Sequence, residues 1–224
     1  MNRTGIVPNE NAVQLYVTCA TIKGIHPVGL HAYDGQISAS DYSIRKQQYD
    51  QAFEHVERVK NNITQKGLIT PVVVAGGSPT FPFHAKQGTV ECSPGTFVYW
   101  DKSYLDLFPE QQFLPAALVI TRVISVVAQN RYCLDLGHKS IASENILTRR
   151  VFFLNAPEAE FISHSEEHLI IQTKEKELSI GDVLYGMPIH ICPTCALYEK
   201  GVTVKGHIAQ GEWSIIARNR KISI

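Results

Sequence analysis

The stretch that decides the fold is Pro71-Val72-Val73-Val74-Ala75, which runs directly into Gly76-Gly77-Ser78-Pro79-Thr80. A short, uninterrupted run of apolar residues is typical of a strand buried on both faces, as in a parallel sheet. The glycine, serine and proline residues that follow predict a turn at the end of that strand. This strand and its loop therefore predict one unit of an α/β fold.

Helical patterns flank this strand. Asn9 or Asn11 can cap a first helix, and Asp41 can open a second, longer helix that ends before Gly67. A further short strand is expected near Thr89–Cys92. Because helices and short apolar strands alternate, the first half of the chain predicts an α/β domain with a parallel sheet.

The pattern changes at about Ala116. The rest of the chain contains short runs rich in β-branched and aromatic residues, separated by turn residues, which is typical of an all-β domain. The expected strands are Leu118–Val127, Tyr132–Leu136, Arg150–Leu154, His168–Thr173, Val183–Ile191, Val202–Ala209 and Trp213–Ile216.

Composition excludes several classes of function. The 224 residues carry 21 basic and 21 acidic side chains, so the basic surface of a nucleic-acid-binding protein is not expected. No apolar run approaches the ~20 residues of a membrane helix, and the N-terminus does not resemble a signal peptide. The five cysteines form no disulfide framework, which favours the reducing cytoplasm.

The segment Pro188-Ile189-His190-Ile191-Cys192-Pro193-Thr194 is the strongest indication of chemistry. If it continues the strand that begins at Val183, His190 and Cys192 project from one face, because residues two apart in a strand do so. An imidazole beside a thiol suits zinc, and two protein ligands leave positions open, as in a catalytic site. Two other interpretations stay open: Cys192 is a small packed hydrophobe, or Cys192 and Cys195 form a redox pair. The redox interpretation ranks lower because no helix is evident after the first cysteine.

Two loops lie where parallel strands end. In Gly76-Gly77-Ser78, backbone N–H groups and a hydroxyl can converge on a phosphate, although an ordinary turn has the same composition. His31-Ala32-Tyr33-Asp34-Gly35 occupies the equivalent place one unit earlier. Polar groups at the carboxyl ends of barrel strands are where barrel enzymes place their chemistry.

Several motifs, taken in order, resemble one family of enzymes. The motifs are 1-MNRTGI-6, 29-GLHAYDG-35, 76-GGSPT-80, 94-PGTFVYWD-101, 134-LDLGHK-139, 165-SEEH-168 and 190-HICPT-194. By their identity and order, the sequence resembles the D-threonine aldolase and D-serine dehydratase-like family over essentially its whole length. These are pyridoxal phosphate (PLP) enzymes of the alanine racemase fold type.

The resemblance implies α/β plus all-β architecture, in which the C-terminal half of a PLP-binding (β/α)8 barrel precedes a β-strand-rich domain. Residues 1–115 would be the partial barrel and residues 116–224 the D-serine dehydratase-like domain that carries the metal site. A complete barrel takes about 250 residues, so the first strands are expected to be missing through N-terminal truncation. No lysine lies in a context that resembles the Schiff-base lysine of the family.

The resemblance also implies roles for particular residues. Arg3 and Tyr33 match residues at the phenolic oxygen and the pyridine nitrogen of PLP, and His31 is expected to shape the same pocket. Gly76, Gly77 and Ser78 match the phosphate-binding loop of the family. His190 and Cys192 match its metal ligands. Cys195 replaces an apolar family position and is interpreted as strand packing.

The family reaction is a lyase reaction on D-hydroxy-amino acids, either dehydration of D-serine or retro-aldol cleavage of D-threonine. Thiolate and imidazole ligands favour zinc over the alternative, manganese. A chain without the lysine is expected to be inactive alone, and a homodimer is expected at full length. The alternatives are a non-catalytic fragment that binds a metal or a partner, and an amino-acid racemase-like enzyme. No nucleic acid or membrane partner is expected.

Overall fold

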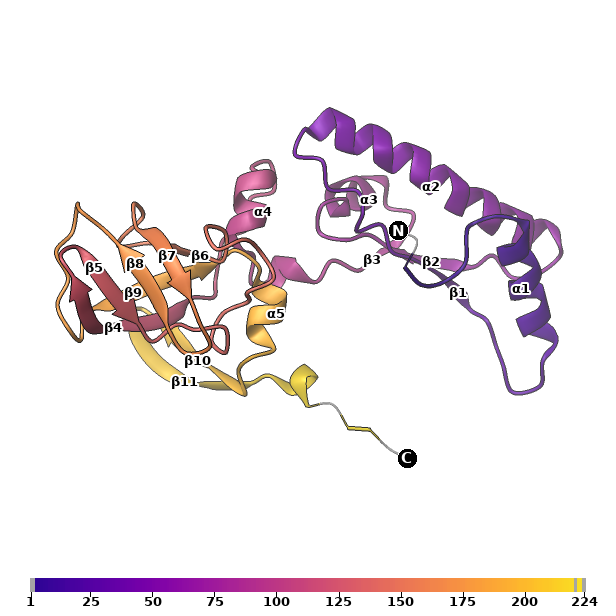
Figure 1. Ribbon diagram of the computed structural model, residues 1–224. Coiled ribbons are helices and arrows are strands. Elements are labelled where there is room, and N and C mark those ends of the chain that lie inside the picture. The colour runs from indigo at the N-terminus through magenta and orange to yellow at the C-terminus, as the bar shows by residue number, and fades with distance from the viewer. Residues whose placement is uncertain (1–2, 220, 223–224) are drawn as a thin grey trace. The chain divides into compact units, whose positions relative to one another are not determined.

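The computed structural model describes residues 3–219 and 221–222, and these pack as two compact units (Figure 1). Unit 1 contains the chain up to Phe97 together with Leu107–Gln112, and unit 2 contains Val98–Asp106 and the chain from Phe113 onward. Within the described residues, no helix is both long enough and apolar enough to cross a membrane.

Unit 1 alternates helices with parallel strands. Its order is α1 (Glu10–Thr21), β1 (Gly29–Ala32), α2 (Tyr42–Gln65), β2 (Val72–Ala75), α3 (Phe81–Gln87) and β3 (Glu91–Cys92), and a 3-10 turn (Thr96–Val98) follows. The sheet order is β1-β2-β3, with Gly29 opposite Val72 and Val74 opposite Glu91. The α/β rhythm predicted from the sequence is confirmed.

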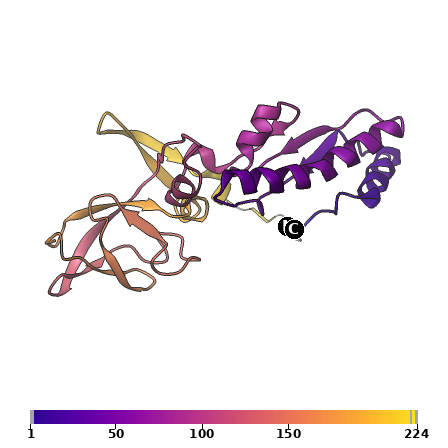
Figure 2. The ribbon, with the colours of Figure 1, turned by 90° about the horizontal axis from the view of Figure 1, so that it is seen from above.

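The helices of unit 1 begin where capping side chains accept backbone hydrogen bonds. The side chain of Asn9 accepts from the Asn11 amide, and the side chain of Asp41 accepts from the Ile44 amide. The long helix α2 runs along one face of the sheet (Figure 2), where Tyr49 and Phe53 pack against Val73. Burial of these apolar faces contributes most of the packing energy in such a layer.

Unit 2 is built around a six-stranded antiparallel sheet with the order β6-β9-β4-β5-β8-β7. One buried cluster, which includes Val123, Leu134, Phe153, Leu169 and Leu184, draws side chains from five of the six strands. The unit also contains the short helices α4 (Lys102–Leu107) and α5 (Ile191–Cys195). The strands are β4 (Val119–Ala128), β5 (Arg131–Leu134), β6 (Val151–Phe153), β7 (Glu160–His164), β8 (Leu169–Gln172) and β9 (Val183–Pro188).

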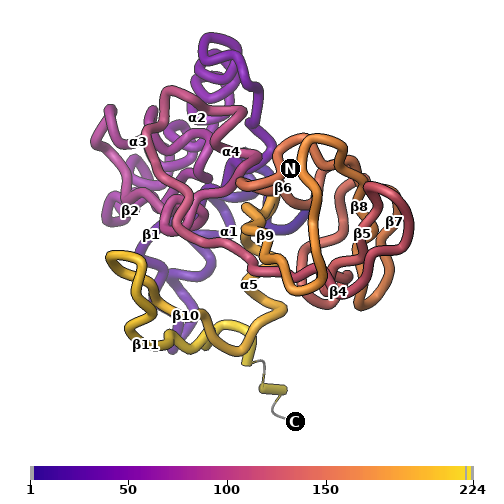
Figure 3. The backbone as a smooth tube through the Cα atoms, turned by 90° about the vertical axis from the view of Figure 1, so that its left-hand side faces the viewer, coloured from indigo at the N-terminus to yellow at the C-terminus, as the bar shows by residue number. Residues whose placement is uncertain are grey.

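The sheet of unit 2 is strongly curled (Figure 3), and its two edge strands, β6 and β7, contact each other through aromatic rings. The rings of Phe153 on β6 and Phe161 on β7 lie 5.8 Å apart in an edge-to-face arrangement. Strand β4 makes this possible, because it pairs with β9 over Val119–Arg122 and with β5 from Val123 onward. Register shifts in its pairing with β5 mark bulges of the kind that bend strands.

Two strand predictions in the second half are corrected here, and one strand was missed. Val202–Ala209 is a hairpin, β10 (Lys200–Lys205) and β11 (Ile208–Ser214), because Gly206 and His207 both adopt positive φ and form the turn (Figure 2). Trp213 belongs to β11, and a 3-10 turn (Ile216–Arg218) follows. Strand β7 (Glu160–His164) was missed because its sequence lacks a β-branched run.

The largest correction concerns Val183–Ile191. Strand β9 ends at Pro188, and His190 is the N-cap of helix α5. His190 and Cys192 therefore do not share the face of a strand, and Cys195 lies at the end of a helix rather than in strand packing.

Candidate functional site

The glycine-rich loop after β2 is held by a carboxylate from the loop after β1. Asp34 Oδ1 accepts from the Gly77 amide at 2.7 Å, and Oδ2 accepts from Thr80 Oγ1 at 2.7 Å. Oδ2 also lies 2.9 Å from Nε2 of His84, which is fully buried. The Gly77 amide is therefore engaged by Asp34 rather than directed at an open site.

The network continues into the core of unit 1. Nδ1 of His84 lies 3.4 Å from the Tyr49 hydroxyl, which donates to Gln87 Oε1 at 2.6 Å. Burial favours the neutral form of Asp34, but hydrogen bonds from His84, the Gly77 amide and Thr80 outweigh it, so the pKa of Asp34 is lowered. Ionised Asp34 thus ties the two loops to α2 and α3.

The two glycines of the loop differ in what they require. Gly76 has φ +96°, and a Cβ placed there would lie 2.8 Å from Cδ2 of His84. A Cβ at Gly77 would meet nothing closer than 3.5 Å, and its nearest neighbour would be the ring of Tyr33. Gly76 is therefore required by the backbone and by His84, whereas a Cβ at Gly77 would make only ordinary van der Waals contacts.

The predicted ring-binding residues lie on the same side of unit 1. Tyr33 follows β1 and is 48% exposed, and the guanidinium carbon of Arg3 lies 5.2 Å from the centre of its ring. His31 lies on β1, with its side chain on the opposite face to that of Leu30, which packs against α2. Ser78 is buried, and its carbonyl accepts from Gln111 Nε2 at 3.0 Å.

We expect Asp34→Ala to destabilise unit 1 by about 3–5 kcal/mol, because it leaves buried partners without their acceptor. Urea denaturation followed by circular dichroism measures this loss. The wild-type stabilisation is complete above the ordinary carboxyl pKa of 3.8 and disappears as the pH falls through the lower pKa of the folded protein. A mutant that unfolds at the wild-type urea concentration would show that the network contributes nothing.

In unit 2, the side chains of His190 and Cys192 meet across the first turn of α5. Their hydrogen bond raises the pKa of His190 to about 9, an effect that burial opposes and Glu144 reinforces. Both residues are exposed at the surface of the unit. The two side chains lie together across a helical turn, and not through the strand alternation on which the sequence prediction rested.

Three polar side chains fix this turn. Glu144 Oε1 lies 2.5 Å from Nδ1 of His190, and the buried carboxylate of Asp101 accepts from the Ile191 amide at 3.1 Å. Thr194 Oγ1 donates to the His190 carbonyl at 2.8 Å and accepts from the Ala142 amide at 3.2 Å.

The buried anchor Asp101 also holds the start of α4, where its Oδ1 accepts from the Tyr104 amide. Burial raises the pKa of Asp101, and its backbone hydrogen bonds work against that rise. These contacts place the start of α5 independently of any bound ion.

The arrangement at His190 suits a metal. Because Nδ1 faces Glu144, Nε2 is the nitrogen directed away from it, and ligating histidines commonly donate their other N–H to a carboxylate. Imidazole and thiol are ligands that zinc accepts. Among the described residues, no group of three or more His, Cys, Asp or Glu side chains is placed to hold a metal.

Sequence reasoning missed Asp34, Glu144 and Asp101 as functional residues. Asp34 and Asp101 stood inside quoted motifs, but nothing in their local pattern reveals partners that lie 43 and 90 residues away. Glu144 lies in a loop without any periodic signal.

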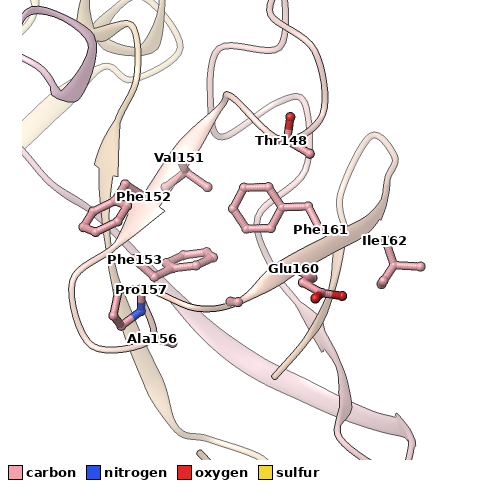
Figure 4. A pocket seen from close by; sticks show the side chains of 10 residues that line it. Thr148, Val151, Phe152, Phe153, Ala156, Pro157, Glu160, Phe161 and Ile162 are labelled. Atoms are coloured by element: carbon pink, nitrogen blue, oxygen red, sulfur yellow. The ribbon is translucent and has the colours of Figure 1, made fainter. Parts of the chain in front are cut away.

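A pocket of about 460 Å³ lies between the edge strands β6 and β7 (Figure 4). Its walls are mainly apolar, with Phe152, Phe153 and Phe161 among them and Glu160 at its margin. None of the predicted site residues lines it.

Comparison with known proteins gives consistent results. Residues 116–204 match the family model described as "Putative serine dehydratase domain". The 3-hydroxy-D-aspartate aldolase of Paracoccus denitrificans (strain Pd 1222) is 23% identical over 227 residues, which cover 97% of this chain and 58% of that protein. The chain thus spans little more than half the length of this relative.

Solved structures agree. The crystal structure of D-threonine aldolase from Filomicrobium marinum has a TM-score of 0.87 and 25% identity, over 97% of this chain and 60% of that one. D-threo-3-hydroxyaspartate dehydratase, as a cysteine-to-alanine mutant in the metal-free form, has a TM-score of 0.80 and 16% identity, over 95% of this chain and 62% of that one. Another mutant of that dehydratase replaces a histidine two positions before the cysteine. Residues 116–204 thus match a serine dehydratase domain model, and the chain is similar over almost its whole length to D-threonine and 3-hydroxy-D-aspartate aldolases.

Proposed function

We propose that this chain is part of a PLP- and metal-dependent lyase that acts on D-hydroxy-amino acids, either by dehydrating D-serine or by retro-aldol cleavage of D-threonine. The observation that carries the proposal is the His190–Cys192 pair, with Glu144 at the far nitrogen of the imidazole. The mutants of the dehydratase relative support it, because they replace a histidine and a cysteine with the same spacing.

We assign the cofactor and the metal to different halves of the chain. Residues 1–115 would contribute units of an alanine racemase-type barrel, and residues 116–224 would form the β domain with the metal site. The parallel strands β1–β3, with helices between them, support the first assignment. A (β/α)8 barrel has eight parallel strands, so further strand–helix units would be needed to complete the barrel.

In unit 1, the contacts that support binding of the PLP ring are clearer than those that support binding of its phosphate. Arg3 and Tyr33 would hold the ring, with His31 shaping the pocket beside them. Gly76, Gly77 and Ser78 would border the phosphate, on the loop that Asp34 holds in place. When bound, PLP supplies an electron sink for the bond that breaks at Cα. A neutral tyrosine hydroxyl facing the pyridine nitrogen would make that sink weaker than a carboxylate would.

In unit 2, Nε2 of His190 and the thiolate of Cys192 would hold zinc, with manganese as the alternative. When bound, the metal would polarise the β-hydroxyl of the substrate as a Lewis acid. Glu144 would keep the proton on Nδ1 of His190, and Asp101 would fix the backbone from which both ligands project. Softness of the thiolate favours zinc.

Glu144→Gln is expected to lower zinc affinity by about 10–100-fold, because loss of the outer partner of a ligating histidine has that effect in other zinc proteins. Competition with a chromophoric chelator measures the affinity. Glu167→Gln is the matched control, since Glu167 pairs with Lys139 at the surface instead. Equal affinities for Glu144→Gln and the control would remove Glu144 from the metal site.

The 224-residue chain with added PLP and zinc is expected to turn over neither D-serine nor D-threonine, because no lysine stands in the context of the family's Schiff-base lysine. A longer form that supplies the remaining barrel units should release pyruvate from D-serine or glycine from D-threonine. Turnover by the 224-residue chain itself would contradict the proposal that this part is inactive alone.

We also propose that the longer form is a homodimer in the cytoplasm.

A further inference from the structure

Cys192 and Cys195 lie on one turn of helix α5, which replaces the strand expected from the sequence. We propose that these two cysteines form a reversible thiol–disulfide pair, and that formation of their disulfide removes Cys192 from metal binding. The first half of the proposal needs only the two cysteines. The second half rests on the proposed function of the His190–Cys192 pair.

The helix brings the two sulfur atoms within reach of each other. Side chains three residues apart in an α-helix are neighbours, with Cβ atoms about 5–6 Å apart. A disulfide needs Cα atoms about 4.4–6.8 Å apart and Cβ atoms about 3.5–4.5 Å apart, so the two Cβ atoms must approach each other by about 1–2 Å within the turn for the bond to form.

The two cysteines differ in accessibility in the way that sequential attack requires. Cys192 is exposed, whereas Cys195 is half-buried behind it. A small disulfide from solution therefore reaches Cys192 first, and Cys195 is the neighbour that can resolve the mixed disulfide.

The turn is held in place by groups other than sulfur. Asp101 fixes the Ile191 amide, and Thr194, which lies between the cysteines, bonds to His190 and to Ala142. Pro193 fixes its own φ within the same turn. The hydrogen bonds that define α5 can thus persist while the sulfur chemistry changes.

The oxidant is a small-molecule disulfide such as oxidised glutathione. Cys192, as thiolate, attacks one sulfur of that disulfide, and the other sulfur leaves as a thiolate that takes up a proton. Cys195 then gives up its proton and attacks the Cys192 sulfur of the mixed disulfide, which releases the second small thiol. In total the chain loses two protons and two electrons, and the small disulfide takes them up to become two thiols.

Formation of the disulfide prevents Cys192 from binding a metal. Cysteine binds metals as a thiolate, and the sulfur of Cys192 is no longer a thiolate once it is bonded to Cys195. Oxidation and metal binding then exclude each other: the disulfide prevents zinc from binding, and bound zinc protects Cys192 from oxidation.

The test uses the full 224-residue chain, freed of metal with a chelator and incubated with oxidised glutathione. Remaining thiols are alkylated, and the peptide that spans His190–Leu197 is examined by mass spectrometry. We expect it to be two hydrogen masses lighter, without alkyl groups or glutathione, and to return to the dithiol form with dithiothreitol. Cys19→Ser, which removes a cysteine from α1, is the control and should behave like wild type.

Cys195→Ser should stop at a glutathione adduct on Cys192. If the wild-type chain also accumulates only that adduct, with Cys195 still open to alkylation, the disulfide proposal is wrong. Pre-loading with zinc should slow oxidation at least tenfold, and the oxidised chain should fail to bind zinc. If the disulfide forms but zinc neither protects it nor is excluded by it, the pair is real and the metal assignment of Cys192 fails instead.

Discussion

Cys192→Ala is expected to lower the zinc affinity of this chain by more than about hundredfold, because even loss of an outer partner of a zinc ligand costs 10–100-fold. The substitution removes one of two protein ligands and leaves His190 alone beside Glu144. Equilibrium competition with a chromophoric chelator measures the affinity, and thermal melting checks that unit 2 stays folded.

Cys195→Ala is the matched control, since it removes a thiol from the same helical turn. Cys195 is half-buried at the end of α5, so its removal should leave zinc affinity nearly unchanged under reducing conditions. Equal loss in the two variants would place the metal on Cys192 and Cys195, and would contradict the pair proposed here.

Gly76→Ala is expected to destabilise unit 1 by about 2–4 kcal/mol, because a non-glycine residue at this backbone conformation and an overpacked neighbour each cost about 1–3 kcal/mol. Gly76 has φ +96°, and the added Cβ would lie 2.8 Å from the buried ring of His84. That ring is hydrogen-bonded to Asp34, so it cannot move without loss of the contact between the two loops. The midpoint of urea denaturation reports the effect.

Gly77→Ala provides the comparison at the adjacent position. Its Cβ would make ordinary contacts of 3.5–3.6 Å with Tyr33, Asp34 and Pro79, so the change should cost less than about 1 kcal/mol. If both alanine variants were equally stable, the distinction drawn between the two glycines would be wrong.

The elements that could be predicted are those whose signal is local. The caps at Asn9 and Asp41 and the run Val72–Ala75 lie within a few residues of the structure they specify, and the structure confirms each of them. The same holds for β4, where β-branched residues recur along the strand, and for β8, which contains two adjacent isoleucines.

The parts that could not be predicted depend on contacts between distant residues. Ile189-His190-Ile191 has the composition of a strand, but Asp101 accepts from the Ile191 amide 90 residues away and helps to start a helix there. In the same way, the Gly77 amide is bonded to Asp34, which no local pattern reveals. The residues proposed for chemistry could be named from the sequence, whereas the carboxylates that position them could not.

The central claim is that His190 and Cys192 hold one metal ion together, and crystals grown with zinc test it most directly through anomalous scattering. We predict one strong zinc peak about 2.0–2.1 Å from Nε2 of His190 and about 2.3 Å from the sulfur of Cys192. Glu144 should still accept a hydrogen bond from Nδ1 of His190. A peak bonded to Cys192 and Cys195 but not to His190, or zinc bound only elsewhere on the chain, would contradict it.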